Sequence, residues 1–187
     1  DANPFVDPAT GDYYMYFSRG QSGPIAAYTD EWGPIYQGQT IYVVKMIGHD
    51  WSQVDYSTVS MIIRPHMSFV SQKACDDYYE DAKNFDNSSF KIKVDEVKGA
   101  TENPFKWEPV NSDTCSSRIN EGPHMIYNKD CGLYYLSFSA GNYGVNTYAS
   151  NVVVGYSPMG PFRKLTYEEG GAMLTVDIGR SSDVMSG

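Results

Sequence analysis

The sequence predicts an all-β protein, and two observations carry this prediction. Aromatic residues make up 14% of the chain and include 16 tyrosines, which favour strands because a flat ring packs well on a pleated surface. The apolar residues come in short runs separated by polar turns, without the spacing of an amphipathic helix. We therefore expect strands and hairpins throughout, with most aromatic rings packed between sheets.

A strand–turn–strand unit occurs twice, in residues 4–20 and again in residues 123–141. The two turns, Asp7 to Asp12 and Asn128 to Gly132, consist of residues that tolerate tight or left-handed backbone conformations. An aromatic-rich run with high β propensity follows each turn. With Pro4 aligned to Pro123, both copies are predicted to be β-hairpins.

Two more apolar runs follow each hairpin. Residues 41–46 and 152–157 are predicted to be third strands, and residues 59–63 and 171–176 fourth strands. Four successive antiparallel strands that recur along a chain are typical of a β-propeller blade rather than of a sandwich. The predicted fold is a β-propeller of four-stranded antiparallel blades, here incomplete, with about two to three blades.

The repeat divides the chain into three segments of one partial propeller domain. Residues 1–65 are predicted to be one blade, and residues 119–187 the next blade and the start of another. Residues 66–118 repeat nothing and are predicted to be an insertion, with short structure of its own in residues 90–97. The acidic cluster in residues 76–81 lacks the ligand spacing of a calcium loop and is interpreted as a solvated charge run.

Charge and cysteine content exclude several classes of partner. A formal net charge of -9 and a pI near 4.7 disfavour nucleic acid and anionic lipid surfaces, because phosphate groups are repelled. No apolar run approaches the roughly 18 residues that cross a bilayer, and residue 1 starts no signal-peptide pattern. Cys75, Cys115 and Cys131 include no C-x-x-C pair, so no zinc site is predicted. Three cysteines can form at most one disulfide bond, and the sequence does not decide whether one forms.

Two acidic residues occupy nearly matching places in the repeats: Asp1 lies three residues before Pro4, and Glu121 two residues before Pro123. The innermost strand of a blade lines the central channel, so we expect both carboxylates at one channel mouth. Paired carboxylates across a cleft are the catalytic groups of glycosidases, and a neighbouring carboxylate raises the pKa of the proton-donating acid. Taken singly, Asp1 is better explained as a solvated chain end, and Glu121 is explained equally well as a turn cap. Taken as a pair at matching places of the repeat, the two acids favour the functional interpretation.

Three motifs occur in and around the second hairpin. They are Asn120-Glu121-Gly122-Pro123-His124, the hairpin sequence Gly-x-Tyr-Tyr-Leu at residues 132–136, and Tyr-Ser-Pro-Met-Gly-Pro-Phe at residues 156–162. Together these motifs resemble glycoside hydrolase family 43. The resemblance covers both ends of the chain and leaves out the insertion.

The resemblance implies a five-bladed propeller and an inverting mechanism, with an Asp base on the first blade, an orienting Asp on the second and a Glu acid on the third. Glu121 falls on the acid, and Asp1 on the Asp that orients the acid and modulates its pKa. The blade with the base then lies outside the chain, which alone is expected to lack turnover. An alternative alignment makes Asp1 the base, but the single blade between Asp1 and Glu121 disagrees with the family order.

Further expectations follow from this resemblance. Substrate contacts are predicted at His124, Asn120, Phe5 and Tyr143. The alternatives are a hydrogen-bonded strand histidine for His124 and core packing for Phe5 and Tyr143. The substrate class is arabinose- or xylose-containing plant polysaccharides or oligosaccharides, in an extracellular or periplasmic location. No cofactor is expected, although calcium is compatible with the complete propeller. The remaining blades or a second chain are expected to cover the exposed sheet faces. The alternative function is a glycan-binding propeller without catalysis.

Overall fold

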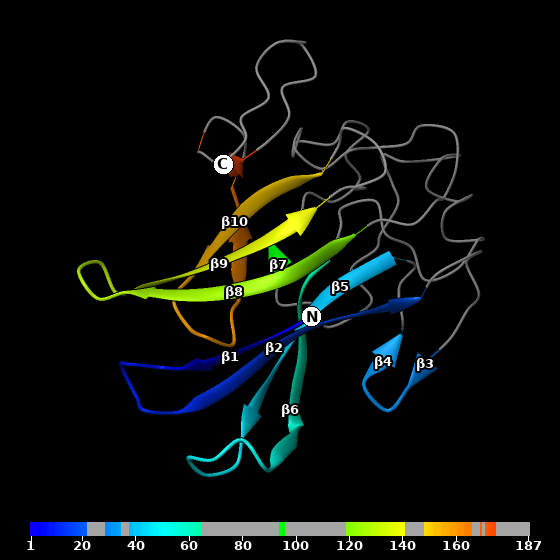
Figure 1. Ribbon diagram of the computed structural model, residues 1–187, viewed down its shortest axis with the longest axis vertical. Coiled ribbons are helices and arrows are strands. Elements are labelled where there is room, and N and C mark those ends of the chain that lie inside the picture. Colours follow the sequence, from blue (N-terminus) through cyan, green and yellow to red (C-terminus); the bar gives the residue numbers. More distant parts are fainter. Residues whose placement is uncertain are drawn as a thin grey trace.

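The computed structural model describes residues 1–21, 29–34, 38–64, 94–95, 119–140, 148–165, 169 and 171–174. These residues form strands and turns, and no α-helix occurs among them. Accordingly, this part of the chain contains no helix with the length and apolar character of a membrane span. Two large sheets pack against each other, and a small hairpin of β3 (Thr29–Asp30) and β4 (Gly33–Pro34) lies beside them (Figure 1).

The first sheet is a four-stranded antiparallel blade in which neighbours in sequence are neighbours in space. Its order is β1-β2-β5-β6. The strands are β1 (Ala2–Val6), β2 (Tyr13–Gln21), β5 (Gly38–Met46) and β6 (Val54–Ile63). Pro4 has no N–H to donate, and it is tolerated in β1 because β1 is an edge strand of this sheet.

The second sheet repeats this arrangement with the order β8-β9-β10-β11. Its strands are β8 (Asn120–Asn128), β9 (Leu133–Ala140), β10 (Ala149–Gly155) and β11 (Phe162–Lys164). A short strand, β7 (Val94–Asp95), pairs in parallel with β11 and lies within the predicted residues 90–97. The predicted fold class, all-β with four-stranded antiparallel propeller blades, is confirmed for the described residues.

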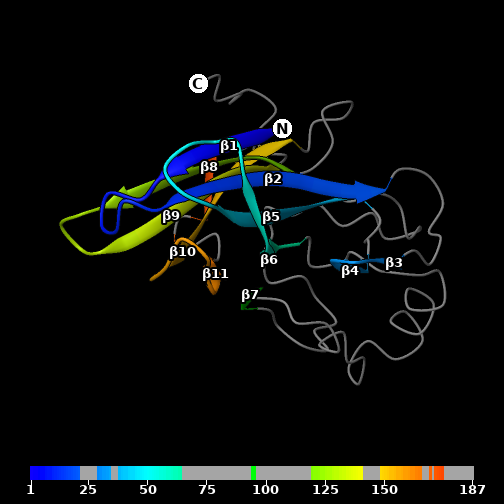
Figure 2. The same ribbon diagram turned by 90° about the horizontal axis from the view of Figure 1, so that it is seen from below.

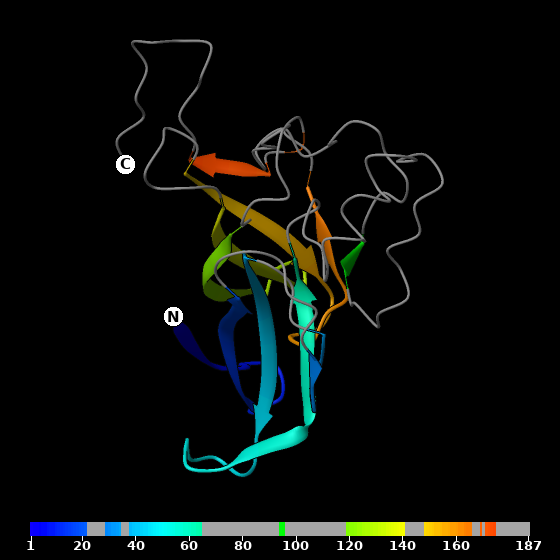
Figure 3. The same ribbon diagram turned by 90° about the vertical axis from the view of Figure 1, so that its right-hand side faces the viewer.

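One strand prediction needs correction. Residues 171–176 were expected to form the whole fourth strand of the second blade, but two short strands share that edge of β10. β11 pairs with residues 153–155, whereas β12 (Ala172–Leu174) pairs with Ser150 and Asn151 (Figure 3). The register between β10 and β12 also shifts between Ser150 and Asn151. The outer edge of β10 is therefore covered by two short strands and not by one continuous strand.

The two hairpin turns have the same construction, which confirms the repeat. The Gly11 N–H donates to the Asp7 carbonyl at 2.7 Å, and the Gly132 N–H donates to the Asn128 carbonyl at 2.8 Å. Both glycines have positive φ, 78° and 69°, a conformation in which a Cβ would be strained. Each turn begins with a side-chain oxygen that accepts a backbone N–H two residues on. The turns project from the same side of the molecule (Figure 2).

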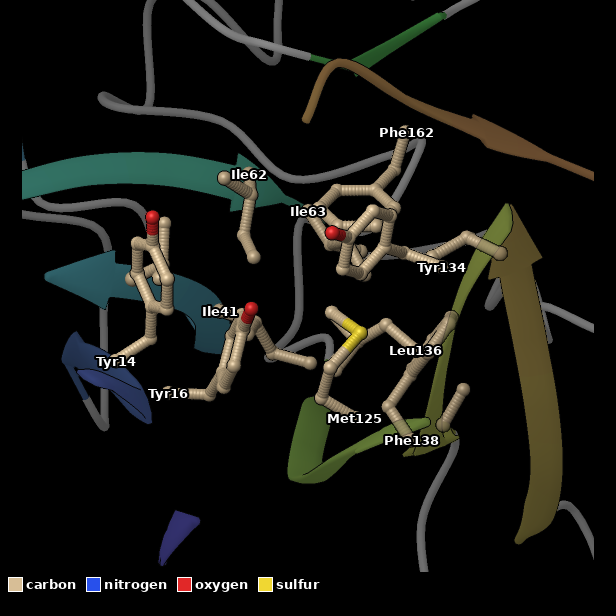
Figure 4. Close-up of a cluster of buried hydrophobic side chains, with 13 residues drawn as sticks. Tyr14, Tyr16, Ile41, Ile62, Ile63, Met125, Tyr134, Leu136, Phe138 and Phe162 are labelled. Atoms are coloured by element: carbon tan, nitrogen blue, oxygen red, sulfur yellow. The ribbon is translucent and has the colours of Figure 1, made fainter. Parts of the chain in front are cut away.

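The core lies between the two sheets (Figure 4). Burial alternates strictly along β9, as expected for a strand with one face in a core. Side chains from both sheets interdigitate there; the buried members of the cluster are Tyr14, Tyr16, Ile41, Val43, Ile62, Ile63, Met125, Tyr134, Leu136, Phe138, Ala140, Val153 and Phe162. Because residues from both repeats contribute, each sheet buries the apolar face of the other.

Hydrogen bonds between the sheets cross this core. The Tyr134 hydroxyl donates to both carboxylate oxygens of Asp7, at 2.9 and 3.0 Å, and the Asp7 side chain is fully buried. The Tyr16 hydroxyl donates to the Pro158 carbonyl at 2.7 Å. Burial raises the pKa of Tyr134, and its bond to Asp7 raises it further, so the phenol stays a donor well above neutral pH.

We predict that Tyr134→Phe lowers the free energy of unfolding by about 1.5–3 kcal/mol, because a buried carboxylate loses its phenol donor. Above the ordinary tyrosine pKa of 10.0, unfolded wild-type chains lose a proton that the folded protein keeps, so wild-type stability falls as pH rises. In Tyr134→Phe this alkaline decline should be shallower. Urea denaturation between pH 7 and 11 measures both effects. Tyr127→Phe, whose ring packs 4.7 Å from that of Tyr134, is the control and should change little.

Gly155 permits a close approach of two segments. A Cβ at this position would lie 2.8 Å from the Pro161 carbonyl oxygen and 2.9 Å from the Phe162 ring. We predict that Gly155→Ala lowers the free energy of unfolding by about 1–3 kcal/mol through overpacking. Ser150→Ala on the same strand is the control. Equal urea midpoints for the two variants would contradict this steric explanation.

Candidate active site

Asp1 and Glu121 occupy equivalent positions in the two blades. The Ser18 N–H donates to the Asp1 carbonyl at 3.2 Å, and Ser139 is the partner of Glu121 across β8 and β9. Ser18 and Ser139 each lie seven residues after their turn glycine. The two acids therefore face matching residues of the neighbouring strand, as the repeat predicted.

The alignment of Pro4 with Pro123 is wrong, because the stretch from Glu121 to His124 contains one residue more than the equivalent stretch from Asp1 to Asn3. Asn3 pairs with Tyr16, and His124 pairs with Ser137 at the matching place of the second blade. Asn3 therefore corresponds to His124.

The additional residue is a β-bulge beside Glu121. The register between β8 and β9 shifts between Glu121 and His124, and Gly122 has a φ of 60°. Pro123 cannot donate to the ladder, and a bulge is a place where such a residue is tolerated. Without the bulge, residues three apart would face opposite sides of the sheet. With it, half-buried Glu121 and exposed His124 share one face.

The Asp1 carboxylate lies against this bulge. Its Oδ2 atom is 3.9 Å from the place where a Cβ on Gly122 would be, and Ser139 Oγ is 4.0 Å from the same place. A side chain at residue 122 would thus be in contact with both oxygens. The structure brings Asp1 of the first blade next to the strand that carries Glu121 of the second.

Tyr148 contacts Glu121 and was missed by the sequence analysis. Its hydroxyl donates to Glu121 Oε1 at 2.8 Å. Burial raises the pKa of Tyr148, a side-chain hydrogen bond with Ser139 lowers it, and the bond to and charge of Glu121 raise it. Tyr148 directly precedes β10, which starts at the same end of the sheet as β8. Its position at the start of a predicted strand, at the same sheet end as Glu121, was the signal available in the sequence. The sequence analysis predicted Tyr143 as the aromatic residue near the acid instead.

His124 is held by the other blade. Asn3 Oδ1 accepts the Met125 N–H at 3.2 Å, which directs Asn3 Nδ2 toward His124 Nδ1, also at 3.2 Å. Because Nδ2 is a donor, Nδ1 must accept, and the ring proton is assigned to Nε2. His124 is therefore oriented by the first blade at the face shared with Glu121, and no hydrogen bond between His124 and Glu121 occurs among the described residues.

The other three residues predicted to contact substrate are Asn120, Phe5 and Tyr143. Asn120 is fully buried beside Glu121, and its Nδ2 donates to the Ile119 carbonyl at 2.9 Å. The Phe5 ring packs edge-on against Tyr16 and Tyr134, with centroids 6.3 and 6.4 Å apart, so it contributes to the core. Tyr143 lies outside the described residues. A contact of Asn120, Phe5 or Tyr143 with sugar stays a prediction.

Within the described ranges, no three His, Cys, Asp or Glu side chains are grouped so that they could hold a metal ion. The acidic cluster of residues 76–81 lies outside these ranges. Cys131 is a free, exposed thiol, and Cys75 and Cys115 are not among the described residues.

The face of the second sheet that points away from the core is partly apolar. A hollow of about 630 Å³ lies over it, and Ile126 and Met173 at its lining are 52% and 53% exposed. That further blades or a second chain cover such a face stays a prediction.

Comparison with known proteins gives structural similarity alone: no protein-family model and no curated protein matches the chain. The similar solved structures include glycoside hydrolases of family 43. A thermostable family-43 glycoside hydrolase is 19% identical with a TM-score of 0.48, and the match covers 88% of this chain and 36% of that structure.

Two further similar structures come from Bacteroides thetaiotaomicron. An endo-1,4-β-xylanase is 22% identical, with a TM-score of 0.48 and coverage of 87% of this chain and 34% of that one. An endo-arabinase is 11% identical, again with a TM-score of 0.48, and the coverage is 87% and 40%. The chain thus spans between a third and two fifths of the length of these three structures.

We predict that Asn3→Ala lowers the free energy of unfolding by about 1–3 kcal/mol, because the Met125 N–H loses its acceptor and His124 its donor. Val6→Ala on the same strand, at a position that is 45% exposed, is the control and should change stability little. Both are measured by urea denaturation. A loss for Asn3→Ala no greater than that for Val6→Ala would show that the blades do not depend on this contact.

Proposed function

We propose that this chain is part of an inverting glycoside hydrolase in which Glu121 is the general acid. The observation that carries the proposal is the arrangement at the Gly122 bulge. There, the Asp1 carboxylate of the first blade lies against Gly122, the residue that follows Glu121, and a phenol holds the Glu121 carboxylate. A carboxylic acid beside a second carboxylate is the arrangement that delivers a proton to a glycosidic oxygen.

In the proposed reaction, the proton of the Glu121 carboxyl group moves to the glycosidic oxygen, and the bond from that oxygen to the anomeric carbon breaks. A water molecule attacks the opposite face of the sugar and gives its proton to a base. The resemblance assigns this base to a blade outside the chain. In this proposal Asp1 orients the sugar.

The proposed substrate is an arabinose- or xylose-containing polysaccharide or oligosaccharide. The support comes from the motif resemblance around Glu121 and from the net charge of -9, which suits a neutral ligand better than an anionic one. The xylanase and arabinase activities named for the similar structures differ from each other, so they select no linkage. A polymer of this kind is met outside the cell, which agrees with the expected extracellular or periplasmic location.

Glu121→Gln in the intact protein tests the proposal. The amide keeps the shape of the side chain but cannot donate an acidic proton, so hydrolysis of alkyl arabinofuranosides or xylosides should fall by about 10²–10⁴-fold. Binding of the same sugars, measured by calorimetry, should stay within about threefold, because shape and polarity are retained. Asp130→Asn, at an exposed acid in the β8–β9 turn, is the control and should keep full activity.

Full activity of Glu121→Gln would show that another group is the acid. The alternative function, a glycan-binding propeller without catalysis, makes a different prediction. In that case the wild-type protein binds the sugars and hydrolyses neither alkyl nor dinitrophenyl glycosides.

A further inference from the structure

Tyr148 and Glu121 flank β9, and the Tyr148 side chain extends across this strand to Glu121. Tyr148 directly precedes β10, whereas Glu121 lies on β8, and β9 separates the two strands in the sheet. The Tyr148 side chain nevertheless donates to Glu121 Oε1 at 2.8 Å. Ser139 of β9 lies between them, opposite Glu121. Side chains from β8, from β9 and from the residue just before β10 thus form a single row.

The two oxygens of the Glu121 carboxylate are not equivalent in this row. Oε1 accepts the phenol, and within the described part of the chain no other hydrogen bond to Glu121 occurs, which leaves Oε2 without a partner. In a protonated carboxyl group one oxygen accepts and the other carries the proton. A phenol that donates to Oε1 therefore favours the form in which the proton is on Oε2.

We propose that Tyr148 is a positioning residue for the acid, which holds Glu121 Oε1 and thereby makes Oε2 the oxygen that delivers the proton. This inference rests on the proposed function. When the Oε2–H bond breaks, the proton passes to the glycosidic oxygen, which also receives the electron pair of the breaking carbon–oxygen bond. The carboxylate that forms keeps the Tyr148 bond, now strengthened by its charge. The contact therefore stabilises the transition state more than the ground state.

The environment keeps Tyr148 in the donor form. Burial raises the pKa of its hydroxyl, and the bond to and charge of Glu121 add to this, against the lowering effect of Ser139. The side chain is 37% exposed, so its edge is accessible from the same face as the acid.

Tyr148→Phe removes the hydroxyl and keeps the ring. Two substrates of the intact protein, one whose leaving group needs a proton and one whose leaving group does not, distinguish a positioning role from a structural one. On an alkyl pentoside, which needs protonation of the leaving oxygen, kcat should fall by about 10- to 100-fold, as for a misplaced catalytic group. On the 2,4-dinitrophenyl glycoside of the same sugar, whose leaving group needs no proton, kcat should stay within about twofold. A purely structural role would lower both rates equally, and that result would overturn the proposal.

Tyr156→Phe is the matched control. Tyr156 is 86% exposed at the other end of β10, and its loss should change neither rate. A selective loss on the alkyl pentoside for Tyr156→Phe as well would overturn the assignment to Tyr148.

A second measurement does not depend on turnover. With tyrosine labelled at the ring Cζ, the NMR signal missing from Tyr148→Phe identifies Tyr148, and its pKa is followed by titration. Glu121→Gln should lower this pKa, because the neighbouring negative charge is removed. An unchanged value would show that the contact does not exist. If the wild type hydrolyses neither glycoside, the proposed function and the positioning role fail together, whereas a failure of the leaving-group test alone removes only the role of Tyr148.

Discussion

The packing of the two sheets against each other is the interaction on which the rest of the structure depends. Each sheet has one continuous apolar face, and the two faces meet in a single core. An isolated sheet would leave that face in water. It would then lose the stabilisation of about 25 cal/mol that burial gives for each Å² of apolar surface. Tyr16 and Tyr134 place their rings in this core and their hydroxyls on acceptors of the opposite repeat. Hydrophobic burial and specific polar contacts therefore favour the same arrangement of the blades.

The candidate site is a consequence of that arrangement. The first strands of the two blades lie side by side, so residues at their starts meet without any loop having to carry them. Asn3 then fixes the position of β1 along β8 through the Met125 N–H and the His124 ring. Asp1, two residues before Asn3, is held near Gly122 as a result. A site built on strands in this way is held more rigidly than one built on loops.

The bulge at Gly122 distinguishes the two blades chemically. An acid lies at the start of both first strands, Asp1 just before β1 and Glu121 as the second residue of β8, but only β8 has the additional residue that turns Glu121 and His124 to one face. A glycine is favoured there because φ is positive. The same backbone irregularity thus orients Glu121 toward Tyr148 and leaves space for the second carboxylate. Bulges commonly occur next to active sites for this reason.

The sequence by itself determined the features that depend on local patterns. The turns at Asp7 and Asn128, the four strands of the first blade, the first three strands of the second and the matching positions of Asp1 and Glu121 follow from turn residues, alternation and the repeat. Tertiary structure decided what depends on contacts between distant strands. The alignment of Pro4 with Pro123 failed because a bulge adds one residue without changing the pattern of residue types. The contact of Tyr148 with Glu121 and the division of the outer strand into β11 and β12 depend on the register between strands. A pattern along one strand does not contain that register, because it is set by how side chains pack across the sheet.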